Sequence, residues 1–273
     1  MSAFILTSCG GADSDTSPFV GKIEFKANGM GMNTTGSITM DAENERMTYR
    51  MDALEKFMGV DVAMMIDMKN NMSYTICPSQ GIYMETALEK NDVKGELPSK
   101  AEVEEMKKEF FSKLKKTGKQ EVLNGLTCDE YVLKEKVDEL ESATIWVSKP
   151  MLDRMTANFE MMAELKKLGA DELMIGFPMK GSFKADGKTG SFEVTKITEG
   201  KNALADFDLS KMKKMGQMEF SKKLMESSSL GDMMNGIDDM KQKGAFDDLD
   251  MDELTKELEG LKDVDPKELE KMM

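Results

Sequence analysis

Hydrophobic and polar residues alternate along much of the first half of the chain. In residues 19–27, charged side chains separate Ile23, Phe25 and Ala27. This period of two predicts a strand with one buried and one solvated face. The alternation recurs in residues 38–40, 47–51, 62–68, 72–76 and 82–84. Turn residues separate these segments, so we expect consecutive strands to pair as an antiparallel meander.

Two helices are predicted to interrupt the strands. Ser99 and Glu102 have the spacing of a capping box, which predicts a helix start. Apolar residues follow there at intervals of three and four: Val103, Met106, Phe110 and Leu114. The second helix is expected to begin at Ser148 and to end before Gly169. Its apolar side holds Leu152, Met155, Phe159, Met162 and Leu165.

Further strands are predicted at residues 120–123, 131–133 and 144–147. The dipeptide Asp186-Gly187 lies between two alternating segments, which is a specific signal for a β-hairpin. That hairpin extends the predicted sheet to about residue 197.

From residue 206 onward the apolar period becomes helical. Residues 206–273 hold 11 Lys against 18 Asp and Glu, a net charge of −7. They predict acidic amphipathic helices appended to the sheet, which could contact a protein partner. A solvated tail that folds only marginally is the alternative, because short amphipathic helices need a surface to cover.

Composition excludes several function classes. The chain of 273 residues has a formal net charge of −14, which argues against nucleic-acid binding. It contains no His, so mechanisms and metal sites that need imidazole are excluded. Phosphate-loop and nucleophile-elbow motifs are also missing. We therefore expect no enzyme, no cofactor and no metal centre built on His.

The amino terminus predicts the cell compartment. An apolar stretch at residues 3–6 is followed by small residues and Cys9, an order typical of secretory signals. The segment Leu6-Thr7-Ser8-Cys9 resembles the lipobox of bacterial lipoproteins, which implies acylation of Cys9. We divide the chain into a signal remnant at 1–9, a tether at 10–18, a sheet domain at 19–205 and a helical tail at 206–273.

Cys77 and Cys128 remain when Cys9 is assigned to the lipid anchor. An even pair in an oxidising compartment predicts a disulfide. Two buried free thiols are the alternative, because sequence gives no distance between the two residues.

The strand pattern also carries a family resemblance. The segments Gly21-Lys-Ile-Glu-Phe25, Arg46-Met-Thr-Tyr-Arg50 and Asn124-Gly-Leu-Thr-Cys-Asp-Glu-Tyr131 resemble a family of bacterial lipoproteins of unknown function. That family is placed near the Lol-type lipoprotein-localisation carriers. The resemblance implies an α+β fold, in which inserted helices cover a strongly curved antiparallel sheet, a half-barrel. No catalytic residue is implied.

These observations predict a non-catalytic, lipid-anchored protein of the cell envelope, at the outer membrane or in the periplasm. Its sheet would bind an apolar ligand, either an acyl chain or a lipoprotein. Methionine suits such a surface because its flexible thioether repacks around different ligands. The residues expected to line the site are Ile23, Phe25, Met40, Met47, Tyr49, Met64, Ile66, Met68 and Tyr74. The same residues could instead form a dry core.

Two other functions stay open. The 29 Met include close spacings that could bind Cu(I) through thioethers: Met30-Gly-Met32, Met64-Met65-x-x-Met68, Met212-x-x-Met215-x-x-Met218 and Met233-Met234. A structural lipoprotein that acts through its helical tail is the second alternative.

Overall fold

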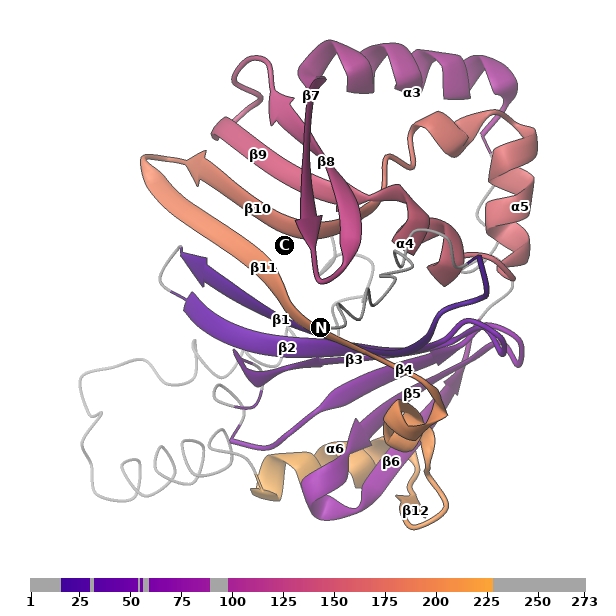
Figure 1. Cartoon of the computed structure of the whole chain (residues 1–273). Helices are drawn as coiled ribbons and strands as arrows, with labels where there is room; N and C mark the ends of the chain where they lie inside the picture. Colours follow the sequence, from indigo (N-terminus) through magenta and orange to yellow (C-terminus); the bar gives the residue numbers. More distant parts are fainter. Residues whose placement is uncertain (1–15, 30–31, 54, 56–58, 89–97, 228–273) are drawn as a thin grey trace, which may run out of the picture. The chain divides into compact units, whose positions relative to one another are not determined.

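The fold is built on one large antiparallel sheet. A computed structural model describes residues 16–29, 32–53, 55, 59–88 and 98–227 (Figure 1). Within them, 12 strands form a single sheet in the order β12-β6-β5-β4-β3-β2-β1-β11-β10-β9-β8-β7. The sheet is open and strongly curved, and helices are inserted between its strands (Figure 1). The α+β class and the curved antiparallel sheet are therefore confirmed.

The strands account for most of the regular structure. They are β1 (Val20–Gly29), β2 (Met32–Asp41), β3 (Arg46–Met51), β4 (Ala63–Asp67), β5 (Met72–Cys77), β6 (Ile82–Ala87), β7 (Leu114–Leu123), β8 (Leu126–Leu133), β9 (Leu140–Ser148), β10 (Phe177–Ala185), β11 (Lys188–Glu199) and β12 (Lys213–Lys214). The helices are α3 (Lys100–Lys113), α4 (Lys149–Met155), α5 (Glu160–Lys167) and α6 (Gln217–Ser227), with short 3-10 turns η2 (Pro78–Gln80), η3 (Ala170–Glu172) and η4 (Lys201–Phe207).

Two meanders make up the sheet, and one long-range pairing joins them. Strands β1 to β6 pair in chain order, and so do β7 to β11. β1 then pairs antiparallel with β11, from Gly21 opposite Glu199 to Gly29 opposite Gly190. The predicted hairpin between β10 and β11 is confirmed: Asp186 and Gly187 both have positive φ, as a two-residue type I′ turn requires.

The first predicted helix forms, but most of it faces water. In α3 the Ser99 and Glu102 capping box is complete. Val103 is the buried residue of the helix, whereas the Met106 side chain is 50% exposed. Leu114 ends the helix and begins β7, so this strand starts six residues before the predicted one.

The second predicted helix is broken into α4 and α5, which corrects the single helix expected from Ser148 to Gly169. Ser148 does accept the capping hydrogen bond from the Met151 amide. At the break, the Thr156 hydroxyl donates to the Leu152 carbonyl at 2.8 Å. Such a local bond competes with continuation of the helix. Phe159 then precedes α5 in an extended conformation.

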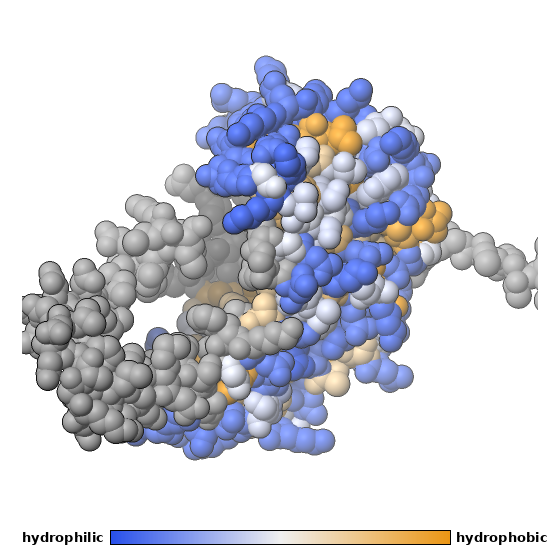
Figure 2. Space-filling view, turned by 90° about the vertical axis from the view of Figure 1, so that its left-hand side faces the viewer, coloured by the Kyte–Doolittle hydropathy of each residue, from blue (hydrophilic) through white to orange (hydrophobic). Residues whose placement is uncertain are grey.

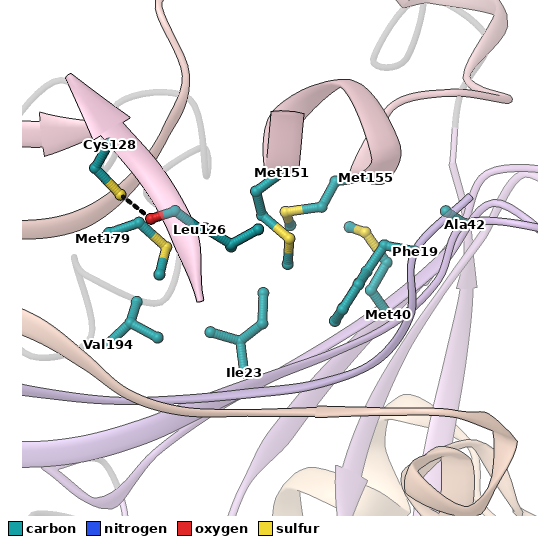
Figure 3. Close-up of a cluster of buried hydrophobic side chains, with 10 residues drawn as sticks. All are labelled: Phe19, Ile23, Met40, Ala42, Leu126, Cys128, Met151, Met155, Met179 and Val194. Carbon is teal, nitrogen blue, oxygen red and sulfur yellow. Dashed lines mark hydrogen bonds between the residues drawn. The ribbon is translucent and has the colours of Figure 1, made fainter. Parts of the chain in front are cut away.

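The largest cluster of buried apolar side chains lies where α4 meets the sheet (Figure 3). Met151 and Met155 of α4 contribute to it, together with Ile23 of β1 and Met40 of β2. The other buried members are Phe19, Ala42, Leu126, Cys128, Met179 and Val194. Methionine therefore serves here mainly as a core residue, because its thioether fills irregular space.

The sheet domain continues beyond residue 205, which corrects the predicted boundary. Phe207, Leu209 and Met212 pack against a second buried cluster on β4 and β5. Strand β12 then pairs parallel with β6. The chain divides into two compact units, Met1–Lys222 and Lys223–Met273. Most of the predicted helical tail lies outside the described residues.

Two turns of the first meander share one Asp-x-x-Asn design. At the end of β2, the Asp41 carboxylate accepts bonds from the Asn44 side chain and the Arg46 guanidinium, both at 2.9 Å. At the end of β4, Asp67 binds Asn70 in the same way. Burial raises the pKa of Asp41, but the bonds from Asn44 and Arg46 outweigh it and hold the pKa below its ordinary value.

A buried arginine ties α4 to one end of the central strand pair, where β1 begins and β11 ends. The Arg154 side chain is 3% exposed and makes a bidentate ion pair with Glu199 of β11, at 2.9 and 2.7 Å. Its Nε donates to the Ser17 carbonyl at 3.1 Å. Its guanidinium also lies 5.6 Å from the centre of the Phe19 ring. Arg154 thus fixes where β1 begins and where β11 ends.

We expect Glu199→Ala to lower the free energy of unfolding by about 3 kcal/mol, because it leaves the Arg154 charge buried without its partner. Urea denaturation measures the loss. Asp153→Ala, which removes the exposed partner of Lys149, is the control and should cost less than about 0.5 kcal/mol. Equal losses in the two variants would contradict the role given to Arg154.

The Asp41 turn should make stability depend on pH. The folded-state pKa of Asp41 lies below its ordinary value of 3.8, so ionised Asp41 stabilises the folded protein at pH values above 3.8. This stabilisation is lost as the pH falls through the folded-state pKa. We therefore expect the stability gap between the wild type and Asp41→Asn to be constant above about pH 5 and to shrink below about pH 4. Thermal unfolding across pH measures it, and a gap that widens in acid would refute this account.

Candidate functional site

One face of the first meander carries a continuous row of mostly apolar side chains. Residues paired directly across antiparallel strands lie on the same face of a sheet. The row runs from Ile197 of β11 through Ile23, Ile38, Tyr49, Met64 and Thr75 to Met84 of β6. A second row beside it contains Met40, Met47 and Ile66. We call the first row the apolar track.

The structure brings seven of the nine predicted lining residues onto this face. They are Ile23, Phe25, Met40, Met47, Tyr49, Met64 and Ile66. Tyr74 lies on the opposite face, because it pairs with Met65 and not with Met64; there it packs against the second cluster. Met68 follows the end of β4. Whether these residues bind a ligand stays a prediction.

Burial varies along the apolar track, from complete burial at Ile23 to the greatest exposure at Met64. Ile23 is fully buried beneath α4, and so is Met40 in the neighbouring row. Tyr49 is half-buried, and the Met64 side chain is 52% exposed. The first part therefore belongs to the core, and the part from Tyr49 to Met84 presents apolar groups at a surface.

Aromatic packing stiffens the middle of this face. The Phe25 and Tyr49 rings stack with centroids 6.1 Å apart. Phe25 also covers Gly36, where an added Cβ would come within 2.5 Å of the ring. Burial raises the pKa of Tyr49, so its phenol stays neutral at ordinary pH. The face thus offers packed, uncharged rings next to the exposed thioether of Met64.

Sequence reasoning missed four members of the track: Ile38, Thr75, Met84 and Ile197. Ile38 and Met84 are in segments whose alternation was recognised, so their strands were predicted. Their places in the row depend on the register between strands, which alternation within one strand does not give. Ile197 depends in addition on the pairing of β1 with β11, far apart in the chain.

The predicted disulfide between Cys77 and Cys128 is wrong in this structure. Neither cysteine forms a disulfide, and both are buried. Cys77 ends β5 and Cys128 lies in β8, and these strands are in different meanders of the sheet. Burial raises the pKa of Cys77, although a hydrogen bond with Ser79 lowers it in part, so its thiol is poorly reactive.

Within each methionine spacing that suggested copper, the described side chains do not all turn to one place. Met64 and Met65 are consecutive in β4 and point to opposite faces; the first is exposed and the second buried. In the spacing from Met212 to Met218, Met215 is buried whereas Met218 is 88% exposed. No cluster of three or more His, Cys, Asp or Glu suited to a metal occurs among the described residues. The other two spacings lie outside the described side chains.

Two features of the chain bear on membrane attachment. Cys9, the predicted lipidation site, is outside the described residues. Among the helices of the described part, none has both the length and the apolar character needed to cross a bilayer.

Comparison with known families gives one match. A family model described as "Domain of unknown function (DUF4412)" matches residues 19–212, which span the sheet and the segment that packs on β4 and β5. No curated protein matches the chain.

Solved structures show partial likenesses at low identity. PNGF-II is 13% identical, with a TM-score of 0.36 over 76% of this chain and 32% of its own. The Pseudomonas aeruginosa MucA/MucB complex contains a chain 12% identical, with a TM-score of 0.35 over 70% of this chain and 56% of that one. A Vibrio parahaemolyticus domain named for outer membrane lipoprotein sorting is 8% identical, with a TM-score of 0.22 over 72% of this chain and 93% of its own. The chain thus spans about a third of the length of PNGF-II.

We expect Cys77 and Cys128 to resist alkylation in the folded protein and to react fully in denaturant, since both are buried. Intact-mass spectrometry after iodoacetamide treatment, with and without urea, counts the modified thiols. The Cys128→Ala variant shows which of the two thiols has reacted. A wild-type protein that needs a reductant before either residue reacts in urea would show a disulfide and contradict the structure.

Proposed function

The chain belongs to the DUF4412 family of domains of unknown function, and from that premise we propose that it is a non-catalytic protein that binds an apolar chain along the apolar track. The family resemblance recognised in the strand segments agrees with this membership. The ligand is an acyl chain, either of a free lipid or of a lipoprotein.

The exposed end of the apolar track carries this proposal. From Tyr49 to Met84 the row crosses three strand-to-strand steps, which is about 14 Å. One acyl chain spans half of a bilayer core, about 15 Å. The surface and the ligand therefore match in length, and Met64 stands in the middle, half exposed to solvent.

The chemistry of the track supports a non-specific apolar ligand. The part from Tyr49 to Met84 carries no charge; Met64 is exposed there, and Tyr49, Thr75 and Met84 are half-buried. Thioethers adapt to chains of different shape at little cost in rotamer strain. Such a surface would contact acyl chains of several lengths, whereas a branched and rigid lining would select one.

The location proposed for the protein is the cell envelope, where Cys9 would carry the lipid anchor. The lipobox-like segment before Cys9 and the polar residues 10–18 after it support this. The tether would hold the sheet domain away from the bilayer. A partner for the C-terminal residues is part of the same proposal and rests on their acidic, amphipathic sequence.

We expect Met64→Lys to weaken binding of palmitate by about tenfold, because a charge in the track opposes an apolar chain. Displacement of a dansylated fatty acid by palmitate, with full-length protein carrying Cys9→Ser, measures the affinity. Met106→Lys is a matched control: Met106 is also half exposed, at 50%, but lies on α3.

Equal weakening in the two variants would show that binding is not at the track. Absence of displacement from the wild type at about 100 μM palmitate would reject the acyl-chain ligand altogether.

A further inference from the structure

Two polar rows cross strands β9, β10, β11 and β1 on a face that the apolar track does not use. The first row is Trp146, Lys180, Glu193 and Lys26, in which each residue is paired directly with the next. The second row, paired in the same way, is Thr144, Ser182, Ser191 and Asn28. Along β1, Lys26 and Asn28 alternate with Phe25 and Ala27, so these rows lie on the other face of that strand.

These eight side chains surround a hollow of about 200 Å³. A neighbouring hollow of about 240 Å³ extends it past Ser142 and Thr189. From β9 to β1 the rows span about 14 Å. Figure 2 shows one side of the molecule, where hydrophilic residues predominate and smaller patches of intermediate and hydrophobic residues lie among them.

The charges of the first row are already neutralised. Lys26 pairs with Glu193 at 2.9 Å, and Lys180 pairs with Glu121 of β7 at 3.1 Å. Lys180 also lies 5.8 Å from the centre of the Trp146 ring. A free ion would have to compete with these pairs, so the hollow favours a neutral ligand.

The second row offers unused hydrogen-bonding groups. Within the described residues, no side-chain hydrogen bond engages Thr144, Ser182, Ser191 or Asn28. Three hydroxyls and one amide thus stand side by side, each able to donate and to accept. Trp146 adds a broad apolar ring beside them, half-buried and packed on the core.

We propose that this face is a binding site for a neutral carbohydrate, of the size of a short oligosaccharide. A sugar presents many hydroxyls and one apolar C–H face. The Thr144, Ser182 and Ser191 hydroxyls would form hydrogen bonds with the sugar hydroxyls. The Trp146 ring would pack on the C–H face of the sugar. The site is separate from the apolar track, so a molecule that carries both a sugar and an acyl chain could engage both faces only by passing around the sheet.

Trp146 is the one Trp of the chain, so its fluorescence reports directly on this hollow. Full-length protein carrying Cys9→Ser is titrated with maltotriose, cellotriose, N-acetylchitotriose and, as an anionic probe, inorganic phosphate. We expect at least one trisaccharide to shift the emission saturably. The affinity should not change with NaCl, because the ligand is neutral.

Loss of two hydroxyls in Ser182→Ala/Ser191→Ala should weaken that binding by about tenfold, the effect of two lost hydrogen bonds. Ser221→Ala, at an exposed position on α6, is the control. Palmitate displacement should be unchanged in both variants, which separates this site from the apolar track. The proposal is overturned if no trisaccharide shifts the emission at about 10 mM, if phosphate alone does so, or if the double variant binds as well as the wild type.

Discussion

The pairing of β1 with β11 is the constraint on which the rest of the structure depends. It joins residues about 170 positions apart and turns two local meanders into one sheet. Arg154 holds one end of this pair, where β1 begins and β11 ends, through Glu199 and the Ser17 carbonyl. Because register decides which side chains share a face, this one pairing also places Ile197 on the apolar track and sets Lys26 beside Glu193 in the polar rows.

The sheet uses its two faces for different purposes. On one face of the first meander, apolar side chains run from a core beneath α4 to an open surface at Met64. On the other face of β1, ion pairs and free hydroxyls surround a hollow beside Trp146. The same alternation of strand residues that builds the core therefore builds both candidate sites, and neither needs a catalytic group.

Much of the fold was predictable because it is local. Alternation gave the strands of the first meander, Asp186-Gly187 gave the hairpin, and Ser99 with Glu102 gave the start of α3. The predictions that failed concern contacts between distant parts of the chain or the register between strands. Tyr74 is on the opposite face because of its pairing with Met65. Cys77 and Cys128 fall in different meanders, and α4 ends at Met155, where apolar spacing alone continues the helix.

The central claim is that the surface between Tyr49 and Met84 holds an apolar chain, and photo-crosslinking tests it most directly. A palmitate analogue with a diazirine near its terminal methyl group is bound to the full chain, irradiated, and mapped by peptide mass spectrometry. We expect the label on β3, β4 and β6, at Tyr49, Met64 and Met84, and its loss when unmodified palmitate is in excess. A label concentrated on α3, or one that excess palmitate does not remove, would contradict the account.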